Sequence, residues 1–115
     1  MRECHIRQET MGDIDVVHLD GSLDAYSFSR LETSLRQLAE KDRNRIVLDC
    51  VNLDYINSAS LGALIGFARS ARDQQGDLKL AGLTPKIRSI VELLGFDKIL
   101  QIFPDTQLAV SKFNG

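Results

Sequence analysis

Tryptophan is absent from this chain of 115 residues, and cysteine, proline and histidine each occur only twice. Cys4 and Cys50 lie far apart and form no C-x-x-C motif, and two scattered histidines do not complete a zinc ligand set. We therefore expect no metal site and two reduced thiols, as in a cytoplasmic protein. No nearly uncharged run reaches the ~20 residues of a membrane span, and the N-terminus lacks the apolar stretch of a signal peptide. We expect no membrane association.

A surplus of charge of either sign is also missing. The 14 Lys and Arg residues are nearly balanced by 16 Asp and Glu residues, which gives a formal net charge of −2. Such a balance provides no bulk attraction to nucleic acids or anionic lipids, so we expect no direct nucleic-acid partner. The apolar share of 43% and the charged share of 26% are typical of a soluble folded domain.

Motifs for catalysis or cofactor binding are missing as well. The sequence has neither G-x-x-x-x-G-K-[ST] nor G-x-G-x-x-G, so a phosphate-binding loop is unsupported. Ser22, Ser58 and Ser60 would need a neighbouring base to act as nucleophiles. His18 lies in a predicted strand, where we expect a hydrogen-bonded structural histidine, and aspartates near the strand ends are explained as turn residues and caps. We predict a protein without a cofactor that is not an enzyme.

The residues that are present indicate one domain, 1–115. A chain of 12.8 kDa buries about two thirds of its unfolded surface, which is enough for one core. Short alternating segments at 4–10 and 14–19 predict two strands, and Gly12-Asp13 between them predicts a tight turn. The first two strands should therefore form an antiparallel hairpin.

Helices and strands alternate after this hairpin. Asp24 is expected to cap a helix whose apolar residues recur at helical spacing, and the apolar, β-branched segment 46–51 suits a central strand covered on both faces. The remaining predicted elements are a loop over 52–57, a helix over 59–73 stopped by Gly76, a strand over 78–81, a helix that starts at Thr84-Pro85 and stops at Gly95, a strand over 100–103, and a short helix capped by Asp105 or Thr106.

The predicted order of elements is β-β-α-β-α-β-α-β-α. Strands that alternate with helices make right-handed crossovers, which indicates the α/β class with a mixed, mostly parallel sheet and an antiparallel edge strand. Functional sites in such sheets gather at the carboxyl ends of strands and the amino ends of the helices that follow. Two segments, 20–24 and 54–60, therefore become the candidate site, and we expect loops there.

The helix predicted over 59–73 has an unusual outer face, with one charged residue in six. Asn57 or Ser58 is expected to cap this helix. Two interpretations of the outer face remain open: close packing of a neighbouring helix on its glycines, or a flat docking surface with Phe67 as an apolar anchor. The predicted core face comprises Leu61, Leu64, Ile65, Ala68 and Arg72, and the outer face comprises Gly62, Ala63, Gly66, Phe67, Arg69 and Ser70.

Five short motifs are spread over nearly the whole chain. They are GSLD at 21–24, IVLD at 46–49, YINSASLGALIG at 55–66, LAGLTP at 80–85, and LLGFD at 93–97 followed by Ile102-Phe103. Each motif is weak alone, but their order and spacing together resemble the STAS domain family. The resemblance is to its free-standing bacterial form, the anti-sigma-factor antagonists, and it implies the STAS-like fold.

The resemblance implies a phosphorylation site at the start of the helix over 59–73. Where the family has Asp-Ser-[Ser/Thr]-Gly, this chain has Asn57-Ser58-Ala59-Ser60, which makes Ser58 the modified residue and Ser60 a secondary candidate. Asp24 matches the family's loop aspartate beside the phosphosite. Together with the outer helix face, the implied partner-binding residues are Ser22, Asp24, Asn57, Ser58, Ala59, Ser60, Gly62, Ala63, Gly66 and Phe67.

The resemblance also implies the partners. In the family, the unphosphorylated antagonist binds an anti-sigma factor that is also a serine kinase with a histidine-kinase-like ATP fold, and this frees the sigma factor. Phosphorylation ends the binding, and a serine phosphatase reverses the modification. A phosphate on Ser58 would add about −1.5 to −2 charge to a nearly uncharged patch, so we expect lost binding without refolding. Two alternatives stay open: a phosphorylation-independent scaffold in a signalling or lipid-transport complex, and a small nucleotide-binding protein.

Overall fold

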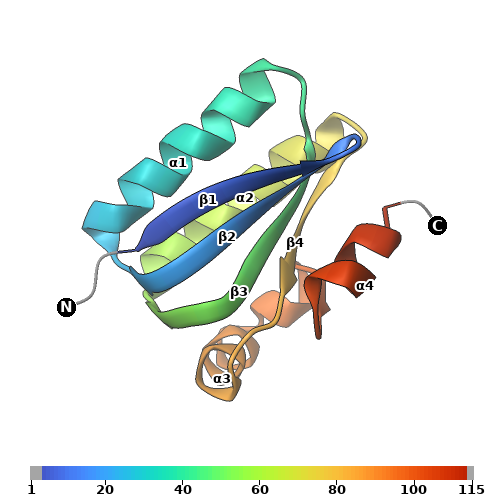
Figure 1. Ribbon diagram of the computed structural model, residues 1–115. Helices are drawn as coiled ribbons and strands as arrows, with labels where there is room; N and C mark the ends of the chain where they lie inside the picture. Colours follow the sequence, from blue (N-terminus) through green and yellow to red (C-terminus); the bar gives the residue numbers. More distant parts are fainter. Residues whose placement is uncertain (1–3, 114–115) are drawn as a thin grey trace.

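The computed structural model describes residues 4–113, and this part of the chain forms five strands, four helices and one 3-10 turn (Figure 1). The order is the predicted one, with the turn η1 as an addition. The elements are β1 (His5–Met11), β2 (Ile14–Leu23), α1 (Ala25–Glu40), β3 (Arg45–Ile56), α2 (Ser58–Asp73), β4 (Asp77–Ala81), α3 (Pro85–Leu93), η1 (Phe96–Lys98), β5 (Ile102–Phe103) and α4 (Thr106–Ser111).

The five strands form one sheet in the order β1-β2-β3-β4-β5. β1 and β2 pair antiparallel, with Met11 opposite Ile14, and the turn between them contains Gly12 at a φ of +67°. The other neighbouring strands pair parallel. The predicted α/β class, the hairpin and the central position of β3 are therefore confirmed.

The carboxyl ends of β2 and β3 differ from the prediction. The sequence predicts loops over 20–24 and 52–57, whereas β2 continues to Leu23 and β3 continues to Ile56. The pairing of the two strands is irregular here, because the register shifts between His18 and Asp20 and again between Gly21 and Ser22. Gly21 has a φ of +122°, which other residues rarely adopt. Beyond this irregularity the strands remain paired, because each satisfies the other's backbone hydrogen bonds.

Other boundaries differ by a residue or two. The helix predicted from Ala59 begins at Ser58, and the strand predicted over 100–103 is reduced to the two residues of β5. Gly76 does not stop α2 as predicted, because the helix ends at Asp73 and the left-handed residue that follows it is Gln75, at φ +63°. Gly76 comes next and is needed there for a steric reason. A β-carbon at this position would lie 1.9 Å from the carbonyl oxygen of Asn44, so no larger residue fits without a backbone shift.

Helices cover the two faces of the sheet unequally (Figure 1). Side chains from α1, α2 and α3 join those of the inner strands in the larger of two core clusters. α4 covers part of the opposite face, where Ala109 packs near Val47 in the smaller cluster. Val47 and Leu48 of β3 thus enter different clusters, which confirms that this strand is covered on both faces. Within residues 4–113, no helix is long and apolar enough to cross a membrane.

His18 lies on the sheet face that carries α4. Its Nδ1 lies 2.7 Å from a carboxylate oxygen of Asp49 on β3, and its Nε2 lies 2.9 Å from Glu9 on β1. Both ring nitrogens are therefore engaged by neighbouring strands. This confirms the prediction that His18 is a hydrogen-bonded structural residue.

Cys4 and Cys50 are both buried and both are free thiols. Burial raises the pKa of Cys50 to about 12 and also raises the pKa of Cys4. Because the thiolate is the reactive form of cysteine, these two residues act as small apolar side chains of the core at neutral pH.

Candidate functional site

Helix α2 begins directly after the carboxyl end of β3. Asn57 is its N-cap, with an extended backbone at φ −88° and ψ 164°, and its side-chain oxygen accepts a hydrogen bond of 2.7 Å from the backbone N–H of Ser60. Of the two capping candidates in the sequence, Asn57 is therefore the one in use. The cap leaves Ser58 as the first residue of the helix, where other backbone N–H groups have no helical partner.

The two candidate phosphorylation sites differ in exposure. Ser58 is exposed, whereas only 3% of Ser60 is accessible. A modifying enzyme must reach the hydroxyl oxygen with its own active-site groups, and Ser58 meets this requirement in the present conformation. Ser60 would have to leave its packed position first, so the structure favours Ser58.

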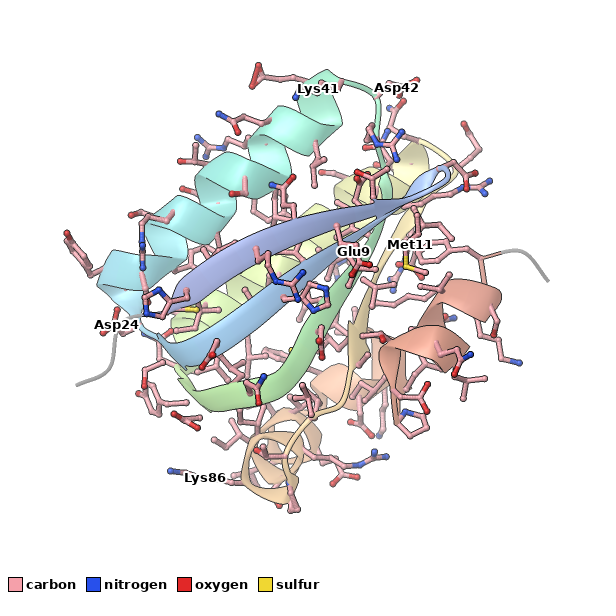
Figure 2. The ribbon with its side chains drawn as sticks, viewed as in Figure 1. Glu9, Met11, Asp24, Lys41, Asp42 and Lys86 are labelled. Carbon is pink, nitrogen blue, oxygen red and sulfur yellow. The ribbon has the colours of Figure 1, made fainter. Side chains whose placement is uncertain are left out.

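Asp24 occupies the corresponding position at the start of α1, and Figure 2 labels it there. Its carboxylate accepts a 2.9 Å hydrogen bond from the backbone N–H of Ser27, while the Ser27 hydroxyl lies 3.0 Å from the Asp24 N–H, and the two bonds form a capping box. The backbone bond from Ser27, together with the Ser27 hydroxyl, lowers the pKa of Asp24. Asp24 is therefore the N-cap of α1 and is ionised at neutral pH.

The pairing of β2 with β3 brings the two helix starts to one corner of the molecule. Leu23 lies opposite Ile56, and the Asn57 N–H donates a 3.4 Å hydrogen bond to the Leu23 carbonyl. Asp24 and Ser58 follow these paired residues by one and two positions. The expectation that 20–24 and 54–60 converge at the strand ends is confirmed. Ser22 lies at the same corner but is only 8% exposed, so its side chain offers a partner little surface.

Within residues 4–113, no other element packs against the two glycines on the outer face of α2. Gly62 and Gly66 are exposed, and a β-carbon built at either position meets nothing within 4 Å. Close packing of another helix on these glycines is therefore wrong for this chain, and the docking-surface interpretation remains. Ala63 and Phe67 are half-buried against the larger core cluster, so Phe67 offers only part of its ring as an anchor.

The predicted core face of α2 needs one correction. Leu61, Leu64, Ile65 and Ala68 are buried as expected, but the fifth buried apolar residue is Ala71, and Arg72 is not buried. Arg72 is half-exposed, and its guanidinium donates to Asp77. The ion pair with Asp77 of β4 holds the Arg72 side chain at the edge of the core. Helical periodicity alone does not reveal such a partner.

Two tyrosines near the site were missed by the sequence analysis. Tyr26 is 79% exposed in the first turn of α1, two residues after Asp24, and Tyr55 is 40% exposed, two residues before Asn57. Large aromatic side chains are enriched at protein interfaces, so their exposure extends the candidate surface beyond α2. The sequence did contain a signal for Tyr26. This residue falls outside the apolar spacing of α1, and a large aromatic residue at such a position lies on the exposed side of a helix.

The side chains at this corner include an exposed hydroxyl and an ionised carboxylate. Both ring nitrogens of His18 are engaged on the sheet, so this histidine is not a base for Ser58. Among the described residues, no group of three or more His, Cys, Asp or Glu could hold a metal ion. What the site presents is an exposed hydroxyl beside free N–H groups and an open apolar helix face.

The chain as a whole is similar to several proteins named as anti-sigma factor antagonists. BtrV of Bordetella bronchiseptica, a candidate anti-sigma factor antagonist, is 34% identical over 107 residues, which are 90% of this chain and 92% of that protein. A candidate anti-sigma factor antagonist from Thermotoga maritima has the same fold, with a TM-score of 0.89 at 18% identity over 96% of this chain and 95% of that one.

The anti-sigma factor antagonist SpoIIAA also shares the fold, and it has been solved in two states. Its unphosphorylated form gives a TM-score of 0.77 at 18% identity over 96% of this chain and 99% of that one. The phosphorylated form, from Bacillus, gives 0.73 at 16% identity over 94% and 98%. The family model of the STAS domain matches residues 5–109, almost all of the fold described above, and the chain belongs to the STAS domain family.

Proposed function

We propose that this chain is an anti-sigma-factor antagonist that binds an anti-sigma factor through the start and outer face of α2. Phosphorylation of Ser58 ends the binding. As the resemblance implies, the partner is a cytoplasmic serine kinase with a histidine-kinase-like ATP fold, and a serine phosphatase reverses the modification. The observation that carries the proposal is the exposed Ser58 at the start of a helix whose outer glycines, Gly62 and Gly66, meet no other element within residues 4–113.

Local electrostatics explain how one phosphate would act. The first turn of α2 has no acidic residue, and its cap is an uncharged amide. Phosphorylation would add about −1.5 to −2 charge there, and the helix N-terminus tolerates a dianion because free N–H groups and the helix dipole face it. The fold therefore persists in both states.

The same phosphate would oppose docking. Burying a dianion against a partner that lacks a basic pocket costs several kcal/mol, since its hydration is lost without compensation. Each ~1.4 kcal/mol is a factor of ten in affinity, so a single phosphate suffices for a binding switch.

Asp24 has a positioning role in this proposal. It lies at the same corner as Ser58, and its capping bonds with Ser27 hold the carboxylate in place. In the complex with the kinase, an ordered carboxylate at the same corner as the acceptor hydroxyl can help to orient that hydroxyl toward the kinase's nucleotide. We expect loss of Asp24 to slow phosphorylation more than it weakens binding.

The decisive test is binding of Ser58 variants to the purified kinase partner, measured by calorimetry. We expect Ser58→Ala to bind like the wild type and Ser58→Asp to bind at least ten-fold more weakly. Ser111→Asp adds the same charge to an exposed position of α4, on the opposite face of the sheet from α2, and should bind like the wild type. Equal affinity of Ser58→Asp and Ser58→Ala would overturn the switch.

Incubation with the kinase and ATP, followed by intact-mass measurement, tests the modification itself. We expect one phosphoryl group on the wild type and none on Ser58→Ala. Binding without any mass gain would favour the phosphorylation-independent scaffold, an alternative suggested by Asn57 and Ser60 in place of the family's aspartate and glycine.

A further inference from the structure

A cavity of about 820 Å³ opens near the opposite end of α2 from Ser58. From Ser58 to Arg72 the helix runs about 21 Å, given a rise of about 1.5 Å per residue. The lining comes from α2, β4, α3, the segment from η1 to β5, and the residue that follows α4. Its charged residues are Arg72, Lys79, Arg88, Lys98, Lys112 and Asp97.

The charge of this lining is opposite to that of the whole chain. Five cationic residues and one carboxylate face the cavity, in a protein that has 14 cationic and 16 acidic residues overall. A local excess of cations in an acidic chain is not a consequence of composition. Like charges gathered in a recess repel one another, so the arrangement is stabilised by an anion that enters it.

Two of the cations form the wall of the cavity and are already compensated. Arg72 donates a 2.8 Å bond to Asp77 and a 2.7 Å bond to the Ile99 carbonyl. Lys79, which is 5% exposed, donates to Asp77 at 3.1 Å and to Gln101. Its ammonium group also lies 4.6 Å from the ring centre of Phe113 and 5.6 Å from that of Phe103.

The other three cations lack comparable partners among residues 4–113. Lys98 of η1 and Lys112 after α4 are exposed and make no ion pair in this part of the chain. Arg88 of α3 has a single 3.8 Å contact with Glu92, and both side chains are about half-exposed. Such a contact contributes little in water. Three cations from separate parts of the chain therefore line the same recess without a strong ion-pair partner among the described residues.

We propose that this cavity binds a small oxyanion with at least two phosphate or carboxylate groups. Ammonium and guanidinium groups make charge-assisted hydrogen bonds to such oxygens. An ion with several anionic groups fits this lining better than a monovalent ion, because its total charge can balance three uncompensated cations. The volume matches that of small-molecule sites, about 300–1,000 Å³, and a single recess does not provide the extended basic stripe that a nucleic acid requires.

The test uses tripolyphosphate and citrate as probes, titrated into the full chain by calorimetry at low ionic strength. We expect saturable binding of at least one probe. The double variant Lys98→Gln/Lys112→Gln should weaken it by about ten-fold, since it removes two of the three uncompensated cations. Comparison of the probes separates phosphate from carboxylate preference, and thermal unfolding of each variant verifies that the fold is intact.

The matched control is Lys41→Gln/Lys86→Gln, which changes the net charge equally. Both lysines are exposed and absent from the cavity lining, and Figure 2 shows Lys41 at the far end of α1 and Lys86 extending away from the fold. We expect less than a two-fold change. Equal weakening by both double variants, or no saturable binding of either probe, would overturn the proposal. Kinase binding by Ser58 variants is a separate measurement, so either proposal can fail alone.

Discussion

The two ends of α2 differ in their content of charged side chains. The first turn, from Ser58, contains no charged side chain, and its uncovered face continues through Gly62 and Gly66. All three charged residues of the helix lie in its last five positions. There, Arg72 is joined to Asp77, which in turn holds the buried Lys79.

This difference implies that the start of α2 serves mainly as a binding surface, whereas its end contributes mainly to the stability of the fold. At the neutral end, little in the fold depends on charge, so an added phosphate changes what the surface can bind while the core stays packed. At the charged end, buried groups compensate one another, so removal of a single carboxylate affects the whole fold. The substitutions below test this contrast.

The largest effect is expected at the charged end, from Asp77→Asn. The substitution keeps the shape of the side chain but leaves Lys79, only 5% exposed, without a carboxylate. We expect the free energy of unfolding in urea at pH 7 to fall by about 3 kcal/mol, as for other broken buried pairs. Asp73→Asn removes the same charge from an exposed position of α2 and should change stability by less than about 0.5 kcal/mol. Similar small effects of both would mean that the network contributes no stability.

A smaller effect is expected at the neutral end, from Asn57→Ala. The substitution removes the 2.7 Å bond to the Ser60 N–H, which should cost about 1 kcal/mol and lower Tm by about 4 °C. Asn57→Ser restores a capping oxygen and should recover most of the loss. If Asn57→Ser were as unstable as Asn57→Ala, the start of α2 would depend on something other than its cap.

The smallest effect, and one of opposite sign, is expected for Gly66→Ala. Alanine is favoured over glycine by up to about 1 kcal/mol inside a helix, and a β-carbon here meets nothing within 4 Å. We expect a gain of about 0.5–0.8 kcal/mol in thermal unfolding experiments, because most of this propensity difference is realised at an exposed site. Gly76→Ala is the contrasting variant and should destabilise, because its β-carbon would meet the Asn44 carbonyl at 1.9 Å. Destabilisation by Gly66→Ala would show that the outer face is covered after all.

Helix starts are the features that the sequence predicts best. Asp24, Asn57, Thr84 and Asp105 are all candidate caps, and each accepts a hydrogen bond from a backbone N–H three residues later. The prediction succeeds because donor and acceptor lie within four consecutive residues. Strand ends are predicted less well. β2 and β3 extend beyond Asp20 and Asn52 because each is the other's hydrogen-bonding partner, although they are more than twenty residues apart in the chain.

The sequence by itself determined the order of elements, the α/β class and, to within one residue, the helix caps and the start of α2. Each depends on periodicity or on bonds between near neighbours. Only the tertiary structure decided which surfaces remain open. Gly62 and Gly66 are uncovered because no other element of the described residues packs there, and the cavity gathers Arg88, Lys98 and Lys112 from separate parts of the chain. Both facts depend on distances between segments that are remote along the chain, and local patterns carry no information about those distances.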